Sequence, residues 1–315
     1  MNVSGRPRRW IRGMLTFAAT AAVFVGAAPA HADEPPAGSA AATWLGGTRY
    51  VDTPVARFAY RKSGDGPPIV LLPGGTLWAY TYRDIVPELA RQHTVYAVDL
   101  PGTGYTSLHD KDFGYSVTEM SDALRQFMDA VGLDHATVLA HSLNGSVAAD
   151  FAARYPAAVH RLLLIAPLVL DTELNPNLRL MRVPVVGELA TALMTRSIFV
   201  SNLRAAYTHP ERLTDEVADA YWEPLRRVDN QIAMWQQVRG LEPAAVQREL
   251  GAITAPTLLL WGEHDTIVPT AQANTVASLI PHPTVRIIAD AGHNAHEDDP
   301  AAVTAAIQEF VDQSW

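Results

Sequence analysis

A single hydroxyl stands at the most informative turn of this sequence. Residues 136–152, ATVLAHSLNGSVAADFA, run from an apolar strand-like stretch into a helix-like one, and Ser142 lies between them. The stretch nearly matches G-x-S-x-G, the nucleophile elbow, in which a sharp strand-to-helix turn exposes a serine hydroxyl. Ala140 and Asn144 occupy the two glycine positions, and Gly145 follows one place later. Ser142 is therefore a candidate nucleophile, with an ordinary helix N-cap as the alternative.

Two histidines near the carboxyl end offer a rival chemistry. His293 and His296 lie three residues apart in GHNAHEDD, beside several acids. A metal-dependent hydrolase could use such a group, but this spacing in a loop is less specific than H-E-x-x-H on a helix. For His296 we expect packing or hydrogen bonding instead. The stretch DLPGTGYTS falls short of a dinucleotide-binding loop, since Ser107 replaces its third glycine. We expect neither a metal nor a cofactor.

Strand-like and helix-like segments alternate along the chain and would position these residues. From about Arg49, runs rich in Val, Ile and Leu, such as PIVLLPG and RLLLIAP, alternate with segments of helical period. This pattern is typical of a parallel sheet covered by helices on both faces. Helical stretches broken by prolines interrupt it at 168–250. We predict a core of residues 49–167 and 251–315 with a helical cap at 168–250.

Four motifs, taken in order, resemble the α/β-hydrolase superfamily. LLPGGT stands where that family has a strand followed by His-Gly, and DLPGTGYTS matches its D-x-P-G-x-G-x-S turn. LLLWGEHDTIVP matches the segment that carries the family's acid, and DAGHNAHEDDP the segment that carries its histidine. The resemblance covers essentially the whole chain after the amino-terminal segment. It implies a mostly parallel, eight-stranded α/β-hydrolase sheet with helices on both faces and an inserted helical cap.

The resemblance also implies a catalytic triad of Ser142, Asp265 and His293. A serine hydroxyl is a weak nucleophile until a base takes its proton, and the base needs an acid to orient it. Asp265 and His293 each follow the end of a strand-like run, so both can reach the same rim of the sheet as Ser142. Two weaker candidates for the acid are Glu263 and Asp171.

By the family pattern, the backbone N–H groups of Gly75 and Leu143 would stabilise the oxyanion of acyl transfer. Pro73 replaces the usual histidine of the His-Gly pair. The stretch LWAYTYRDIVPELA resembles haloalkane dehalogenases and epoxide hydrolases, whose nucleophile is an aspartate. This chain has Ser142 at that position, and Leu143 replaces a tryptophan that helps to bind halide. We therefore do not expect dehalogenation.

Apolar side chains of the cap are candidates for a substrate pocket above Ser142. Small-molecule cavities are mostly apolar, with few polar groups. The predicted pocket residues are Trp78, Met181 and Trp235, and further candidates for its roof are Leu180, Val185, Leu189 and Met234. The expected substrate is an uncharged ester of a small to medium apolar acid.

The first 32 residues have the order of a secretory signal peptide. Four arginines precede the apolar run MLTFAATAAVFVGAA, and Ala30-His31-Ala32 fits an A-x-A cleavage site. The run of 15 residues is shorter than the roughly 20 needed to span a bilayer. We expect cleavage after Ala32, no stable membrane anchor afterwards, and a flexible leader at 33–48. The pair Arg8-Arg9 partly fits a twin-arginine export signal.

Charge and composition narrow the partners. The chain has 315 residues, 48% of them hydrophobic, and a formal net charge of −9. Loss of the four signal arginines leaves 24 − 4 = 20 basic residues against 33 acidic ones, a net charge of −13. Such acidity argues against nucleic acid and anionic membranes as partners. We expect a small-molecule substrate and a secreted or cell-envelope location, while the oligomeric state stays open.

Together these residues predict a serine hydrolase, most simply a carboxylic ester hydrolase that acts through an acyl-enzyme. Three other activities reuse the same triad: carbon–carbon bond hydrolysis, removal of N-terminal residues from peptides, and cofactor-free perhydrolysis. A metal-dependent hydrolase and a non-catalytic binding protein are alternatives outside this chemistry. The fold alone cannot choose among these activities.

Overall fold

A computed structural model describes residues 35–313 except 173 and 175. The described residues form one compact unit. The predicted signal peptide at 1–32 lies outside the described residues. No helix in the described part of the chain has the length and apolar character needed to cross a membrane.

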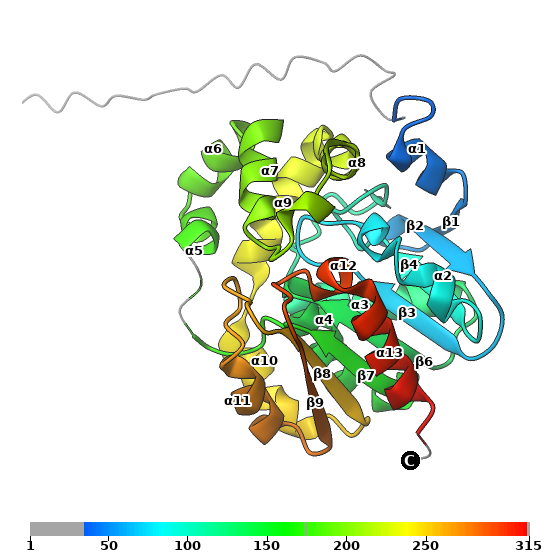
Figure 1. Ribbon diagram of the computed structural model, residues 1–315. Helices are drawn as coiled ribbons and strands as arrows, with labels where there is room; N and C mark the ends of the chain where they lie inside the picture. Colours follow the sequence, from blue (N-terminus) through cyan, green and yellow to red (C-terminus); the bar gives the residue numbers. More distant parts are fainter. Residues whose placement is uncertain (1–34, 173, 175, 314–315) are drawn as a thin grey trace, which may run out of the picture. The chain divides into compact units, whose positions relative to one another are not determined.

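Eight strands form one continuous sheet in the order β1-β2-β4-β3-β6-β7-β8-β9 (Figure 1). β2 pairs antiparallel with β1 and β4, and the remaining pairs along this path are parallel. A two-residue strand, β5 (Ser107–Leu108), adds a ninth strand beside β2. The predicted mostly parallel sheet is confirmed. Its strands are β1 (Thr48–Asp52), β2 (Ala56–Ser63), β3 (Pro68–Leu72), β4 (Thr94–Val98), β6 (Ala136–His141), β7 (Val159–Ile165), β8 (Thr257–Gly262) and β9 (Pro283–Ile288).

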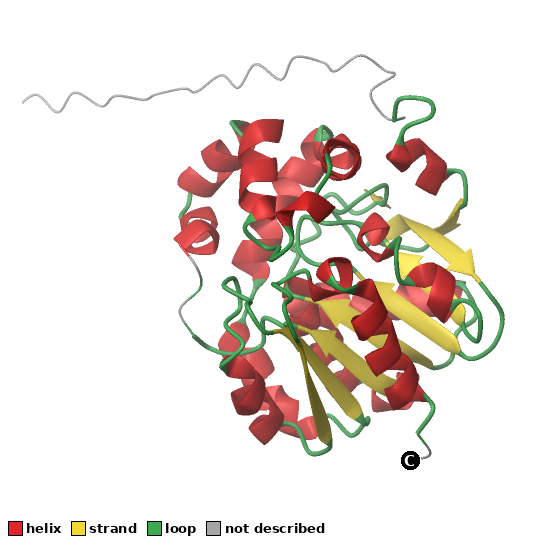
Figure 2. Ribbon diagram, viewed as in Figure 1, coloured by secondary structure: helices red, strands yellow, loops and turns green. Residues whose placement is uncertain are grey.

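The central strands supply a core on each face of the sheet. In β3, Ile69 and Leu71 belong to one core and Val70 and Leu72 to the other, because successive side chains of a strand point to opposite faces. Burial on both faces explains the near-continuous apolar runs in the sequence. Helices cover both faces of the sheet (Figures 1 and 2). One face is covered by α3 (Val117–Ala130), α4 (Leu143–Arg154), α10 (Pro243–Glu249) and α11 (Gln272–Leu279), the other by α2 (Val86–Leu89) and α13 (Pro300–Val311).

Among the described residues, six α-helices lie between β7 and β8, where the sequence predicts a cap at 168–250. Among them, α10 contacts α4 of the body and contributes Val246 to the core. Two shorter segments elsewhere contact each other, the 3-10 helix η1 (Ala79–Tyr82) and α12 (Ala295–Asp298). The other helices of the insertion are α5 (Pro176–Arg182), α6 (Val186–Ala192), α7 (Arg196–Arg204), α8 (Asp215–Leu225) and α9 (Val228–Gly240).

The structure differs from the sequence prediction at residues 33–48, where a flexible leader is expected. Residues 40–45 form helix α1 (Ala40–Leu45). Its Trp44 is 7% exposed and meets the Tyr80 ring edge-on, with 5.8 Å between the ring centroids. The Arg61 guanidinium lies 4.6 Å from the centre of the Trp44 ring. The buried aromatic side chain of Trp44 packs this segment against the body.

Candidate active site

Ser142 lies at the sharp turn between β6 and α4. Its backbone has φ 53° and ψ −121°, a conformation that is strained for a residue with a Cβ. Its N–H donates to the Ile165 carbonyl at 2.9 Å, which ties the turn to the carboxyl end of neighbouring β7. Within the described residues, the Ser142 side chain makes no capping hydrogen bond to α4. The N-cap interpretation therefore does not apply.

The structure brings together the three residues of the predicted triad. His293 Nε2 lies 2.8 Å from Ser142 Oγ, and His293 Nδ1 lies 2.8 Å from Asp265 Oδ2. All three residues are at most 9% exposed. Ser142 follows β6, Asp265 follows β8 and His293 follows β9, so the carboxyl ends of parallel strands place all three at one edge. This arrangement can pass a proton from Ser142 to His293 while Asp265 orients the imidazole.

Asp265 is held by backbone donors, and the two weaker acid candidates lie elsewhere. Its Oδ1 accepts hydrogen bonds from the N–H groups of Ile267 at 2.8 Å and Val268 at 2.9 Å, which leaves Oδ2 for His293. Glu263 is half exposed and accepts a hydrogen bond from the Asp290 N–H instead. Asp171 is exposed, and its N–H donates to Gln247.

The departures from G-x-S-x-G have structural substitutes. A Cβ added to Gly145 would lie 2.5 Å from Pro167 Cβ, so the close approach of α4 to the segment after β7 occurs one place after the usual glycine. Asn144 is fully buried, and its Nδ2 donates to the Pro73 carbonyl at 2.6 Å. Ala140 is buried within β6. The turn therefore forms without glycine at either motif position.

The two segments predicted to form the oxyanion hole lie next to each other. Leu143 is the first residue of α4, and the first N–H groups of a helix have no carbonyl partner in their own helix. A Cβ added to Gly75 would lie 3.0 Å from Leu143 Cδ1, which shows how close the two segments pass. Gly75, Leu143 and Ser142 line the same cavity.

Two further buried histidines surround His293, one of which sequence reasoning missed. His141 Nε2 lies 3.1 Å from the His293 carbonyl oxygen, and its ring centroid is 4.7 Å from that of His293. His296 Nε2 lies 2.7 Å from Thr81 Oγ1 and does not reach Ser142. Burial lowers the pKa of His296 to about 3 and holds the pKa of His141 well below its ordinary value, so both are neutral.

The two histidines of the alternative metal-site hypothesis face different partners. His293 Nε2 faces Ser142, whereas His296 Nε2 faces Thr81. Across the described positions, no group of three or more His, Cys, Asp or Glu residues is arranged to hold a metal ion.

A cavity of about 380 Å³ lies above Ser142. Charged side chains of Asp, Glu, Lys or Arg are absent from the described residues that line it. Polar groups at its wall include Gln237 and Asn202. Its apolar wall is formed mainly by Leu77, Leu143, Leu168, Leu178, Met181, Met194, Phe199, Leu203, Met234, Val238 and Ile267.

Of the three predicted pocket residues, the structure places only Met181 at this cavity. Trp78 is fully buried beside it, and its indole N–H donates to the Ala220 carbonyl at 3.0 Å. Trp235 lies under the Arg239 guanidinium, 4.3 Å from the ring centre. The further candidates for the roof also differ in position. Met234 lines the cavity, whereas Leu180, Val185 and Leu189 are exposed.

Residues 67–300 match the family model described as alpha/beta hydrolase fold. The chain belongs to the α/β-hydrolase family. Members of this family are enzymes, and this α/β-hydrolase is a hydrolase. It is 28% identical over 275 residues to haloalkane dehalogenase 2 of Mycobacterium tuberculosis, across 83% of this chain and 94% of that protein.

Two other proteins are similar to this α/β-hydrolase over most of its length. An uncharacterized protein of Mycobacterium tuberculosis is 26% identical over 276 residues, which cover 81% of this chain and 78% of that protein. The crystal structure of Cfl2 from Burkholderia cenocepacia is 25% identical and has a TM-score of 0.76, with 84% of this chain and 95% of that chain covered.

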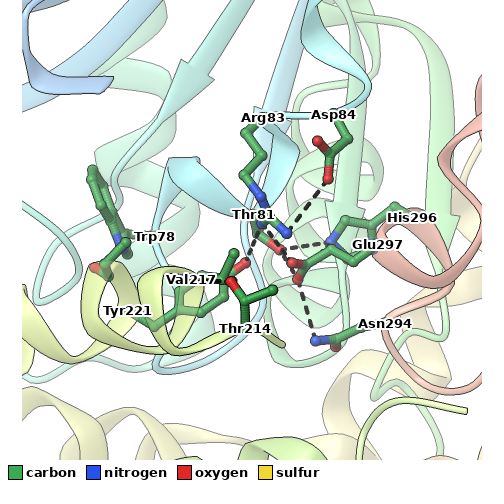
Figure 3. Close-up of polar contacts among 11 residues, drawn as sticks. Trp78, Thr81, Arg83, Asp84, Thr214, Val217, Tyr221, Asn294, His296 and Glu297 are labelled. Atoms are coloured by element: carbon green, nitrogen blue, oxygen red, sulfur yellow. Dashed lines mark hydrogen bonds and ion pairs between the residues drawn. The ribbon is translucent and has the colours of Figure 1, made fainter. Parts of the chain in front are cut away.

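A buried polar cluster next to the triad of this α/β-hydrolase was not expected from the sequence (Figure 3). Arg83 Nη1 lies 2.6 Å from Glu297 Oε2 and donates to the Tyr221 hydroxyl of α8 at 3.1 Å. Thr81 Oγ1 donates to Glu297 Oε1 at 2.8 Å, and Asn294 Nδ2 donates to the same oxygen at 3.3 Å. The cluster joins η1, α8 and α12. The only indication of this cluster in the sequence is the acidic run after His296. Arg83 lies 214 residues from Glu297, so the sequence does not indicate that the two are partners.

Proposed function

We propose that this α/β-hydrolase is an exported serine hydrolase that cleaves carboxylic esters through an acyl-enzyme. The observation that carries the proposal is the chain of contacts from Ser142 Oγ through His293 to Asp265, each 2.8 Å long. A neutral His293 whose Nδ1–H is directed to Asp265 presents Nε2 as an acceptor for the serine proton.

Acylation begins when Ser142 Oγ attacks the ester carbonyl carbon and its proton moves to His293 Nε2. The carbonyl oxygen becomes negative and accepts hydrogen bonds from the N–H groups of Gly75 and Leu143. When the tetrahedral intermediate collapses, the bond to the alcohol breaks. His293 gives its proton to the leaving oxygen, and the acyl group stays on Ser142.

Deacylation repeats the same steps with water as the nucleophile. His293 takes a proton from water as the oxygen attacks the acyl carbon, and the same N–H groups bind the oxyanion. Collapse of the second intermediate returns the proton to Ser142 Oγ and releases the carboxylic acid.

The cavity supports a preference for uncharged apolar esters. It has no carboxylate, ammonium or guanidinium among its described lining residues, so a charged substrate would enter without a counter-ion. This argues against a peptidase that must bind a free N-terminal ammonium. Its apolar wall favours an acyl chain that fills it, at up to about 0.8 kcal/mol per buried methylene.

The dehalogenase relative does not carry its chemistry over to this chain. Displacement of halide by Ser142 Oγ would leave an alkyl ether on the serine, which lacks the carbonyl that water attacks in an ester. A dehalogenase therefore needs a carboxylate nucleophile, and this chain has a serine in the elbow.

The main test replaces Ser142 with alanine. Ser142→Ala removes one oxygen, so the protein should fold but lose ester hydrolysis and covalent labelling by a fluorophosphonate. Ser278→Ala, at an exposed position of α11, is the matched control and should retain both. Near-normal hydrolysis by Ser142→Ala would overturn the serine mechanism.

The substrate range is tested with p-nitrophenyl esters from acetate to palmitate. The rate constant kcat/KM should climb with acyl length until the cavity is full and then fall. A maximum at palmitate would identify a lipase. A panel that adds amides and carbon–carbon substrates would separate the other activities that reuse this triad.

Export rests on the amino-terminal sequence, which lies outside the described residues. Expression in a host with a secretion pathway should give a protein whose N-terminus, determined by mass spectrometry, is Asp33. An intact Met1 in the cell interior would contradict both cleavage and export.

A further inference from the structure

Exposed apolar side chains gather on one part of the cap. Among the described residues, seven of the eleven exposed large apolar side chains lie between positions 180 and 198. We call these seven residues the cap outer face: Leu180, Val183, Val185, Val186, Leu189, Leu193 and Ile198. Exposed apolar side chains concentrated in one segment of a domain commonly mark a binding site.

Helix α6 presents its apolar side to solvent. Val186, Leu189 and Leu193 follow the i, i+3, i+7 spacing of one helix face, and their exposed fractions are 38%, 55% and 71%. The inward side carries Gly187 and Thr191 instead. A surface helix that only packs onto its own domain has the opposite arrangement. The apolar side of α6 is therefore available to something outside the chain.

The inner side of α6 is already packed. A Cβ on Gly187 would lie 2.2 Å from the Met181 carbonyl oxygen, so α6 sits directly on the backbone of α5. The Thr191 hydroxyl donates to the Gly187 carbonyl at 3.1 Å, within the same helix. The buried side of α6 is therefore occupied by α5, and its apolar side faces solvent.

The same segment is basic although the chain is acidic. Residues 176–204 contain four arginines and one acid, against a net charge of −9 for the whole chain. That acid, Glu188, is bound to Arg239 of α9, with Oε1 2.6 Å from Nη1. Arg179, Arg182 and Arg204 are exposed. The fourth arginine, Arg196, forms ion pairs with Asp215 and Asp219 of α8, so the local excess of positive charge lies at the other three arginines, and the net charge of the whole chain conceals it.

We propose that the cap outer face docks on an anionic lipid surface. The apolar side chains can insert at the boundary between headgroups and acyl chains, and the flanking arginines can bind the anionic headgroups. A second copy of this chain fits less well, because a symmetric contact would bring the same positive segments together. Figure 1 shows α5 and α6 at one edge of the cap. α5 also supplies Leu178 and Met181 to the cavity, so docking holds the cavity next to the lipid.

Binding to vesicles tests the proposal without reference to catalysis. The protein is the compact unit from Asp33 onward, which lacks the apolar run at 14–28 that would itself bind lipid. It carries Ser142→Ala so that ester lipids are not consumed. It should cosediment with phosphatidylcholine vesicles that contain phosphatidylglycerol, more weakly with pure phosphatidylcholine, and less as salt is added.

Matched variants locate the surface. Leu193→Glu should weaken binding at least about tenfold, and Arg182→Glu about fivefold or more, since one basic residue near an anionic surface changes binding by about fivefold. Ile287→Glu makes the same change of residue type at a 44% exposed position of β9 and should bind like the parent. Circular dichroism of each variant checks that it is folded. As a second check, the same surface variants are made with Ser142 retained and assayed for hydrolysis of a soluble ester.

Three outcomes would overturn the proposal. The first is absence of binding to either vesicle, and the second is equal binding by Leu193→Glu and Ile287→Glu. The third is a dimer in sedimentation that Leu193→Glu disperses, which would make a second copy the occupant. Vesicle binding is measured on Ser142→Ala proteins and circular dichroism reports their folding, so loss of the proposed hydrolytic function would leave the result intact.

Discussion

Asn144 donates a hydrogen bond of 2.6 Å from its Nδ2 to the carbonyl oxygen of Pro73. Asn144 and Pro73 are two of the residues at which the sequence departs from the family pattern, and they contact each other. The bond joins the first turn of α4 to the loop that carries Gly75. One buried side chain therefore connects the two segments whose N–H groups form the proposed oxyanion hole.

Replacement of Asn144 should affect both stability and turnover. Asn144→Ala leaves the buried Pro73 carbonyl without this donor, which should lower the unfolding free energy by about 1–3 kcal/mol. kcat for ester hydrolysis should fall more than KM rises, since the hole acts mainly in the transition state. Asn274→Ala, exposed on α11, is the control for denaturation and kinetics. An unchanged kcat in Asn144→Ala would show that other contacts hold the loop.

The two histidines of GHNAHEDD should differ sharply in their effect on rate. His293→Gln removes the proposed base and should reduce kcat by at least about a thousandfold. His296→Gln keeps a group that can bond Thr81 and should lose far less. Steady-state kinetics on one soluble ester compares the two variants. Equal losses of kcat would support the hypothesis of a metal-dependent hydrolase.

Buried His296 should make the protein less stable in mild acid. Its pKa is about 3 in the folded protein, below the ordinary value of about 6.5 that applies after unfolding. Between these values the unfolded chain binds more protons, so the stability that neutral His296 provides is complete above pH ~6.5 and is lost progressively toward pH ~3.

Comparison of the wild type with His296→Gln isolates this contribution. As the pH falls below 6.5, the wild type should lose stability relative to the variant, by up to about 1.4 kcal/mol per pH unit. Urea unfolding of both proteins from pH 7.5 to 5 measures the difference. Parallel curves would show that His296 is not held neutral by burial.

The Arg83–Glu297 pair should matter far more than an exposed pair. Glu297→Gln leaves the guanidinium of Arg83 without its buried counter-charge, and removal of one partner of such a pair costs about 3–5 kcal/mol. Glu88→Gln, in the exposed pair with Arg91, should cost less than about 1 kcal/mol. Denaturant unfolding of both variants is the measurement. Similar costs would indicate that the Arg83 site admits water.

Much of the fold could be predicted from the sequence because parallel strands buried on both faces leave near-continuous apolar runs, as in Ile69 to Leu72. The residues of the candidate triad could be found for a related reason. Ser142, Asp265 and His293 each follow such a run, and the ends of parallel strands meet at one edge of the sheet.

Contacts between distant residues could not be predicted in this way. Asn144 and Pro73 are 71 residues apart, and no periodicity links them. The apolar cap residues gave no indication of which side they face, so Met181 lines the cavity while Leu189 is exposed. The same uncertainty affected Trp78, whose indole N–H is occupied by a backbone carbonyl of α8.

The cap contacts the body more firmly at α8 than at α5 and α6. At α8, Trp78 and Arg83 donate hydrogen bonds to Ala220 and Tyr221, two adjacent residues. At the other end, among described positions, α5 has no buried residue and α6 buries only Gly187 and Thr191. Local opening should therefore require less free energy at α5 and α6 than at α8, and amide hydrogens at 176–192 should exchange faster than those at 215–225. Substrate would then enter where α5 and α6 open, on the side that carries the exposed apolar residues.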